Sequence, residues 1–143
     1  MFVGKAIHAV NKDGRVSLPS RMREVINKRY SSDDLYLMLM PEKFICLFPS
    51  EEFERLTSRF DNSSATTLSR IMDMERDMCS EAELCKIDGS GRIVIPPEMK
   101  ESAKINNEVI FIGARSHIEI WNPEHWNWKQ TQRGSDRIAI PAA

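Results

Sequence analysis

Short runs of alternating apolar and polar residues recur along this chain, separated by turn-forming residues. The alternation predicts half-buried strands at residues 6–10 and 15–18, joined by a tight turn at residues 11–14 that is rich in Asn, Asp and Gly. Pro19 has no backbone N–H to donate to a strand ladder, so the second strand should end there. Ser20 is then expected to cap a helix that begins at the next residue.

A second hairpin is predicted after a polar loop. Residues 35–40 are almost continuously apolar, as in a buried strand, and residues 44–48 form the expected return strand after a turn at residues 41–43. Ser50 is expected to cap a helix that begins at Glu51. The acidic residues in the first turn of this helix also suit the helix dipole.

The same pattern occurs a second time. Residues 14–19 and 91–96 both read Gly-Arg, apolar, any residue, apolar, Pro, at an offset of 77 positions (91 − 14 = 77). Further pairs keep this offset: Ile7 with Leu84, Val10 with Ile87, Met22 with Met99, and Arg23 with Lys100. Later the offset becomes 73 (121 − 48 = 73), with Trp121 in the place of Phe48. A duplicated unit explains a match of this length better than chance does.

The duplication predicts strands at residues 84–87, 92–95, 108–112 and 117–121, with helices from about Glu98 and after Asn122. Residues 61–80 carry an apolar stripe at helical spacing, which indicates a linker helix packed on its own half or on a neighbour. We therefore expect a first repeat at residues 1–60, this linker, a second repeat at 81–128 and a C-terminal tail at 129–143. The fold class is α+β, mainly β, with two tandem hairpin-helix-hairpin-helix repeats.

Composition fits one compact domain or two small halves that share a core, since 41% of the 143 residues are hydrophobic and 29% are charged. No apolar run reaches membrane-spanning length, and the N-terminal residues lack a signal-peptide pattern, so a cytoplasmic protein is expected. Cys46, Cys79 and Cys85 form no Cys-x-x-Cys pair, so we expect small packed thiols rather than a disulfide or a metal site.

Positive charge is concentrated at the start of the chain. Residues 1–30 hold seven Lys or Arg and two acids (7 − 2 = +5), whereas residues 31–80 hold five and ten (5 − 10 = −5). A local basic cluster is typical of nucleic-acid binding, which makes Arg21 and Arg23 of the first helix candidate DNA contacts. The alternative is an ordinary solvated helix face.

Enzyme chemistry is not favoured by the sequence. His8, His117 and His125 fall in three different predicted elements, and none has metal-ligand spacing. No glycine-rich phosphate loop or nucleophile motif is present. Asp88 lies in a Gly-rich turn, where a carboxylate more often caps backbone N–H groups than transfers protons. No enzyme activity, cofactor or metal is therefore expected.

The two Gly-rich turns favour DNA binding instead. Each places an arginine, Arg15 or Arg92, directly after a glycine, with Asn11 or Asp88 four residues earlier. A β-ribbon can enter the major groove, where arginine can bond O6 and N7 of guanine, and a neighbouring acid or amide can hold the guanidinium in one rotamer. Structural salt bridges at the turns are the alternative. The candidate phosphate contacts nearby are Lys5 and Lys12.

These residues resemble a known family. Asp-x-x-Gly-Arg-apolar-x-apolar-Pro, occurring twice in part or in full, is similar to the MraZ transcriptional regulators, and the hairpin unit is similar to the swapped-hairpin barrels of the SpoVT/AbrB superfamily. The resemblance covers residues 1–128. Its further anchors are Met1-Phe2-x-Gly4, Pro19 with Arg23, Leu47-Phe48-Pro49 and Ile120-Trp121.

The resemblance implies one pseudo-twofold double-psi or swapped-hairpin barrel with flanking helices, and a ring of subunits. It also implies nucleoid-associated regulation of the division and cell-wall gene cluster by binding double-stranded promoter DNA, and no membrane partner or small-molecule substrate is expected. The family signature Asp-x-x-x-Arg fits Asp88 and Arg92, whereas Asn11 replaces the acid ahead of Arg15. A ring that presents several basic tips gains avidity, so G-rich direct repeats are the expected target. The alternatives are an antitoxin-like protein-partner binder on the same barrel and a purely structural oligomer.

Overall fold

The strands and helices of the computed structural model, which describes residues 1–61 and 67–136, follow the predicted order. The strands are β1 (Lys5–Ala9), β2 (Arg15–Ser17), β3 (Asp34–Leu39), β4 (Ile45–Pro49), β5 (Glu83–Lys86), β6 (Arg92–Val94), β7 (Glu108–Gly113) and β8 (Ile118–Trp121). The helices are α1 (Ser20–Arg29), α2 (Ser50–Asp61), α3 (Leu68–Glu81), α4 (Pro97–Ser102) and α5 (Pro123–Arg133), and a 3-10 turn (Gly134–Asp136) follows α5. The chain thus has the predicted α+β fold.

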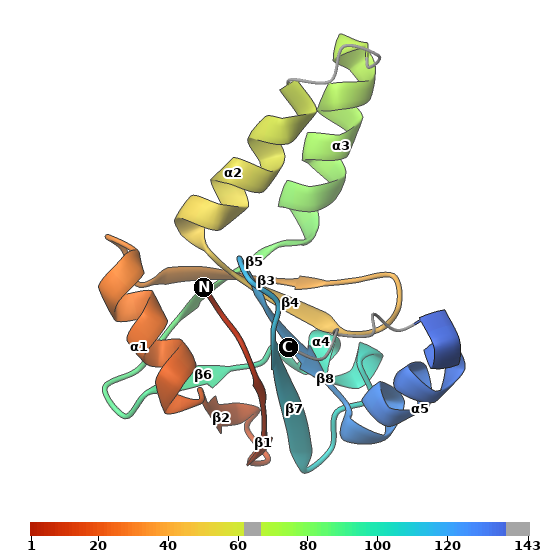
Figure 1. Cartoon of the computed structure of the whole chain (residues 1–143). Coiled ribbons are helices and arrows are strands. Elements are labelled where there is room, and N and C mark those ends of the chain that lie inside the picture. Colours follow the sequence, from red (N-terminus) through yellow and green to blue (C-terminus); the bar gives the residue numbers. More distant parts are fainter. Residues whose placement is uncertain (62–66, 137–143) are drawn as a thin grey trace, which may run out of the picture.

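Six strands form one antiparallel sheet in the order β1-β7-β8-β4-β3-β5, while β2 and β6 form a separate two-stranded ribbon beside α1 (Figure 1). The two repeats exchange strands. β1 of the first repeat pairs with β7 of the second, and β5 of the second pairs with β3 of the first. Replacing each strand by its equivalent in the other repeat gives the same strand order, read from the opposite end of the sheet. The sheet therefore has a pseudo-twofold axis between β4 and β8.

The strands flanking the turn at residues 11–14 do not form the simple hairpin that the local sequence predicts, and nor do those flanking its equivalent in the second repeat, whereas β3 pairs with β4 and β7 with β8 as predicted. The turn itself closes, because the Asn11 N–H donates to the Arg15 carbonyl oxygen (3.0 Å) and Val10 bridges Val16. Beyond this point β1 pairs with β7 and β2 pairs with β6. The exchange buries Val16 and Ile93, which are 1% and 0% exposed, at the centre of the ribbon. This is the swapped-hairpin arrangement that the resemblance implies, although no continuous ladder closes the described strands into a barrel.

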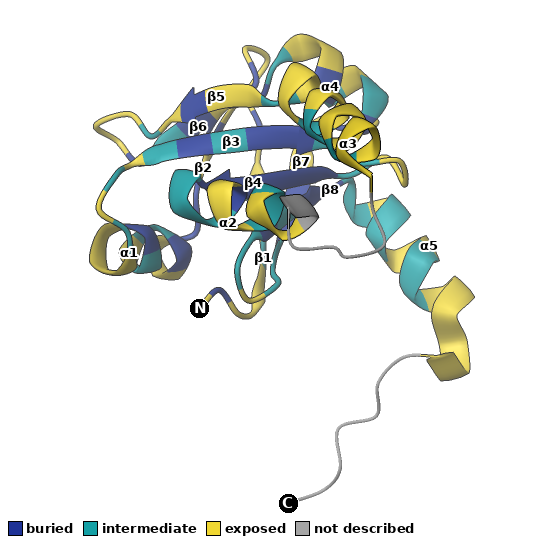
Figure 2. Ribbon diagram, turned by 90° about the horizontal axis from the view of Figure 1, so that it is seen from above, coloured by how far each residue is buried: buried dark blue, intermediate teal, exposed yellow. Residues whose placement is uncertain are grey.

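Apolar side chains pack on both faces of the six-stranded sheet. Alternate residues of a strand point to opposite faces, so Ile45 and Leu47 of β4 join the main core together with the ribbon, α1 and α4. Cys46 and Phe48 point the other way and form a smaller cluster beneath α2 with Met38 and Phe53. Figure 2 shows the central strands buried and the helices exposed on their outer faces.

Helix starts differ in how they are capped. The predicted cap by Ser20 is wrong: α1 begins at Ser20, and the residue before it makes no side-chain cap hydrogen bond. Pro19 takes that position because its carbonyl oxygen accepts the N–H groups of Met22 and Arg23 (3.0 Å each), and its ring already holds a suitable φ. The helix expected after Asn122 is α5, and Asn122 caps it, with its Oδ1 accepting the Glu124 N–H (2.8 Å).

The α2–α3 helix pair projects away from the sheet (Figure 1). α3 packs against α2 of its own chain and has no buried residue, so the part of the predicted linker that is described is an exposed helix. α5 continues to Arg133, into the predicted tail, and residues 62–66 and 137–143 of the predicted linker and tail lie outside the described residues. Among the described helices, none is both long and apolar enough to cross a membrane.

Candidate nucleic-acid interface

The first tip (residues 11–15) is held by the side chain of Asn11. Its Oδ1 accepts the backbone N–H groups of Asp13 and Arg15, each at 2.9 Å. This uses the amide to fix the backbone rather than the guanidinium. Arg15 instead places Nη1 3.6 Å from Asp13 Oδ2, with 46% of its side chain exposed. The expectation that Asn11 orients the Arg15 guanidinium is therefore wrong in this structure, because the backbone satisfies the oxygen first.

The second tip (residues 88–92) has the same backbone and a different side-chain arrangement. Asp88 Oδ1 accepts the N–H groups of Ser90 (2.8 Å) and Arg92 (2.9 Å), while Oδ2 accepts the Arg92 Nε–H at 3.1 Å. The bond from the Arg92 backbone is the largest cause that lowers the pKa of Asp88, and the Ser90 N–H and the guanidinium lower it further against desolvation. Asp88 is thus ionised and holds the guanidinium in one orientation.

The two arginines lie on one face of the ribbon. Val16 and Ile93 are opposite each other and point into the core, so their neighbours on β2 and β6 point outward. Arg15 pairs with Val94 and Arg92 pairs with Ser17, which makes the arginines diagonal neighbours. Diagonal positions are about 7–8 Å apart. The outer face of this short ribbon therefore carries both arginines, and each guanidinium lies toward the acid of its own tip, Asp13 or Asp88.

Each tip is docked on the other repeat. The Ile95 N–H donates to the Gly14 carbonyl oxygen (2.8 Å), and at the equivalent place the Leu18 N–H donates to the Gly91 carbonyl oxygen (3.0 Å). Arg23 of α1 also reaches the second tip, with Nη1 donating to the Ser90 carbonyl oxygen at 3.5 Å. These contacts fix both tips relative to the ribbon.

The remaining predicted site residues are distributed less evenly. Lys12 is exposed in the first tip, whereas Arg21 is exposed on α1. Lys5 begins β1, at the end away from the tip, so it is about five residues or 16 Å along the strand from Val10. Sequence reasoning did not select Lys100, which lines a cavity of about 550 Å³ with Lys12 and Gly14. Lys100 holds the position in the second repeat that is equivalent to Arg23 in the first, and this equivalence was the sequence signal that could have selected it.

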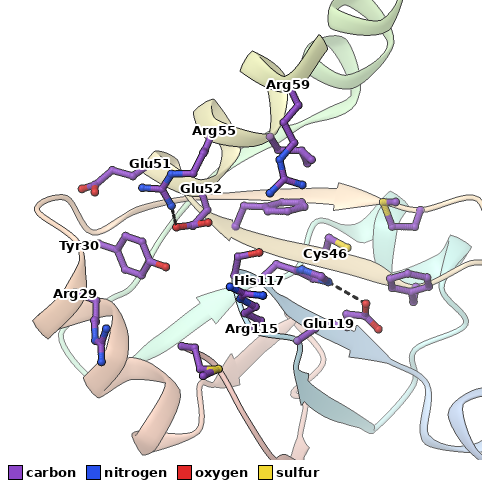
Figure 3. A pocket seen from close by; sticks show the side chains of 17 residues that line it. Arg29, Tyr30, Cys46, Glu51, Glu52, Arg55, Arg59, Arg115, His117 and Glu119 are labelled. Atoms are coloured by element: carbon purple, nitrogen blue, oxygen red, sulfur yellow. Dashed lines mark hydrogen bonds and ion pairs between the residues drawn. The ribbon is translucent and has the colours of Figure 1, made fainter. Parts of the chain in front are cut away.

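One further group of polar side chains was not expected. Cys46, His117 and Glu119 lie together on the wall of a second cavity of about 930 Å³, beneath α2 (Figure 3). Burial and the Glu119 charge raise the pKa of the Cys46 thiol to about 12. His117 directly precedes β8 and Glu119 lies within it, and both side chains line the cavity. Cys46 is far away in sequence, so no local pattern could add it.

Comparison with known proteins gives the family. Residues 78–142 match a family model described as "MraZ protein, putative antitoxin-like". A protein of Syntrophobacter fumaroxidans named transcriptional regulator MraZ is 33% identical over 126 residues, which cover 88% of this chain and 82% of that protein. The chain belongs to the MraZ family.

Two further MraZ proteins, also named transcriptional regulators, match over a similar extent. The one from Thermomicrobium roseum is 29% identical over 88% of this chain and 84% of its own length. The one from Geobacter metallireducens is 26% identical over 99% of this chain and 94% of its own length. Because the match to the Geobacter metallireducens protein covers 99% of this chain, both tips lie within it.

Proposed function

We propose that this MraZ protein regulates transcription by binding double-stranded DNA through the outer face of the ribbon. The observation that carries the proposal is the placement of Arg15 and Arg92 on one exposed face of a two-stranded ribbon. Such a ribbon fits the major groove, and arginine is suited to bidentate bonds with guanine. The backbone positions of the two arginines are diagonal neighbours, and each guanidinium lies toward its own tip. We therefore propose that the two arginines contact separate guanines in each bound site.

The basic side chains around the ribbon have supporting roles in this proposal. Lys12 lies in the first tip and Arg23 lies over the second, where both are placed to meet phosphate groups. Arg21 and Lys5 are more distant phosphate contacts. Asp88 preorganises Arg92, which lowers the entropy lost when the guanidinium binds. We therefore expect Arg92 to contribute more to base recognition than Arg15 does.

A head-to-tail ring completes the proposed mechanism. β1 and β5 are edge strands at opposite ends of the sheet, and their equivalent residues Ile7 and Leu84 are 57% and 55% exposed. Unpaired strand edges are prone to pair with another chain, and a head-to-tail contact that closes produces a ring. A ring presents several ribbons to repeated DNA sites and so raises avidity. The proposed target is G-rich direct repeats in the promoter of the division and cell-wall gene cluster, in the nucleoid.

The deciding experiment measures binding of the full chain to a labelled duplex from upstream of its own gene, over a salt series. Arg15→Ala and Arg92→Ala should each weaken binding by roughly 5- to 100-fold, because each removes a base contact. Arg76→Ala on α3 is a matched control, since Arg76 pairs with Asp73 on the same helix. Lys12→Ala should weaken binding to all sequences alike and reduce the salt slope by about one.

The same measurement separates the alternatives. If wild-type protein shows no preference for this duplex over random DNA, the proposal is overturned. The better hypothesis is then an antitoxin-like protein-partner binder. If the Arg15→Ala/Arg92→Ala double variant binds DNA as tightly as wild type, the DNA contact lies elsewhere on the molecule. A palindromic footprint in place of direct repeats would count against the ring.

A further inference from the structure

Three metal-binding types of side chain converge on the wall of the 930 Å³ cavity. One donor atom from each of Cys46, His117 and Glu119 lies within 4.8 Å of the other two. Cys46 is buried, and the His117 and Glu119 side chains are only 24% and 19% exposed. In Figure 3 the three side chains point toward one another at the cavity wall. They are therefore shielded from bulk water on one side and open to the cavity on the other.

The pseudo-twofold symmetry of the sheet explains why they meet. Cys46 of β4 lies directly opposite Glu119 of β8, and the two positions are equivalent in the repeats (119 − 46 = 73). Their neighbours Ile45 and Ile120 point to the main core, so Cys46 and Glu119 share the other face. His117 precedes Glu119 by two residues and lies on that face as well. One repeat thus supplies sulfur, and the other supplies nitrogen and oxygen.

The carboxylate is held in position before any ion binds. Glu119 Oε1 accepts the Trp121 Nε1–H at 2.9 Å, and Oε2 lies 2.9 Å from His117 Nε2. Trp121 is itself fixed by stacking on Phe44, with ring centroids 4.3 Å apart. The Trp121 bond is an outer hydrogen bond of the kind that orients a metal ligand and strengthens binding, whereas the His117 bond joins two of the ligands and is replaced by their bonds to the ion.

We propose that Cys46, His117 and Glu119 bind one zinc-like divalent ion per chain. Mixed sulfur, nitrogen and carboxylate ligands are the set that Zn²⁺ prefers, and three protein ligands leave a fourth position for water or another ligand. On binding, the Cys46 thiol loses its proton to solvent, so thiolate and carboxylate together balance the charge of the ion. Arg115 and Arg59 line the same cavity and oppose a bare cation, which makes this neutralisation necessary.

The ion would tie the two repeats together at the centre of the sheet. Cys46 belongs to the first repeat, and the other two ligands belong to the second, so binding stabilises the folded chain relative to the unfolded one. The ligands lie beneath α2, whereas the ribbon packs on the opposite face of the sheet. Metal binding is thus independent of the proposed DNA contacts.

The test is a titration of the reduced, chelator-treated full chain with Co²⁺, followed by displacement with Zn²⁺. We expect one Co²⁺ per chain, a thiolate-to-cobalt charge-transfer band, intense d–d bands typical of tetrahedral cobalt, and loss of all bands on adding Zn²⁺. Zn²⁺ should also raise the melting temperature of the wild-type chain. Wild type that binds no Co²⁺, or binds it without the sulfur band, overturns the proposal without any variant.

Variants assign the ligands. Cys46→Ser should abolish the charge-transfer band, and His117→Ala or Glu119→Gln should weaken binding by more than the roughly 10- to 100-fold cost of losing an outer partner. Trp121→Phe should fall within that range. Cys79→Ser and Cys85→Ser are controls and should keep the full spectrum. Arg15→Ala/Arg92→Ala should bind Co²⁺ as wild type does, which separates this proposal from DNA binding. Equal binding by a folded Cys46→Ser variant would refute the site.

Discussion

The carboxylate of Asp88 binds two different parts of Arg92: Oδ1 accepts its backbone N–H at 2.9 Å, and Oδ2 accepts its side-chain Nε–H at 3.1 Å. One residue therefore fixes the turn and aims the guanidinium. In the first tip Asn11 fixes the turn alone, because its amide accepts only backbone N–H groups. The two tips thus share a backbone and differ in how firmly the arginine is held.

Exchanging these two residues should exchange the behaviour of the tips. Asp88→Asn keeps a turn-forming oxygen and loses the ion pair, so we expect DNA affinity to fall by roughly 2- to 5-fold, less than for Arg92→Ala. Asn11→Asp adds the missing carboxylate beside Arg15 and should raise affinity. Fluorescence anisotropy with the same duplex measures both. An Asp88→Asn variant that binds as tightly as wild type would show that Arg92 needs no orienting partner.

Acid should remove the contribution of Asp88 in a defined range. Hydrogen bonds from the Arg92 and Ser90 N–H groups lower the pKa of Asp88 below its ordinary value of 3.8. A lowered folded-state pKa means that this stabilisation is fully present above the unfolded value and is lost as the pH falls through the folded one. Stability from this group should therefore be constant above about pH 5 and decline below about pH 4.

Urea unfolding of wild type and Asp88→Asn at a series of pH values checks this. The difference between the two proteins should be constant above about pH 5 and should shrink in the acid range, because Asn has no proton to gain. Asp13→Asn, which removes the carboxylate of the first tip, is the control. A difference that grows as the pH falls would contradict the assigned hydrogen bonds.

Two glycines allow the tips to dock on the opposite repeat. Gly14 has φ +82°, and a Cβ there would lie 2.6 Å from the Ile95 carbonyl oxygen. Gly91 has φ +78°, and its Cβ would collide with the Arg23 guanidinium. Either Ala substitution should cost about 1–2 kcal/mol from the backbone conformation alone. Gly14→Ala should cost more, since backbone cannot move aside as a flexible side chain can.

Thermal or urea unfolding ranks these variants. Gly89→Ala is the matched control, because nothing lies within 4 Å of its Cβ and no positive φ is required there. Arg23→Ala should recover part of the loss in Gly91→Ala and none of the loss in Gly14→Ala. Equal stability of all three Ala variants would mean that the tips are not docked as described.

Local signals in the sequence predicted the turns, most strand positions and the duplication. Pro19 ends the first return strand because proline has no backbone N–H to donate. This effect can be predicted from the sequence without knowledge of the fold. Strand exchange is different, since the pairing of β1 with β7 depends on residues about one hundred positions apart. The contact of Arg23 with Ser90 likewise depends on α1 lying over the other repeat.

The same distinction applies to the candidate sites. Arg15 and Arg92 were found because each follows a turn glycine, yet their common face on the ribbon arises only when β2 pairs with β6. Cys46 and Glu119 occupy equivalent positions of the two repeats, but their contact arises only because β4 pairs with β8 at the pseudo-twofold axis. Asn11 was misjudged for a physical reason: a short amide near unpaired backbone N–H groups bonds them before it reaches a long side chain.

Strand exchange also predicts that neither repeat folds alone as a monomer. A fragment of residues 1–80 lacks β7 and β6, the partners of β1 and β2, and a fragment of residues 81–143 lacks β3 and β2. Each fragment would expose strand edges and half of the shared core, including Val16 or Ile93. We expect both fragments to be unfolded or self-associated, and their mixture to regain the native circular dichroism spectrum.

Sedimentation and urea unfolding distinguish these states. The full chain should unfold in one cooperative transition, because the two repeats share one core. Ile120→Ala should lower its stability by about 2–5 kcal/mol while keeping a single transition, since Ile120 of β8 packs opposite Ile45 of β4. A monomeric fragment that unfolds cooperatively would contradict the exchange, because a self-sufficient repeat has to pair β1 with its own β2.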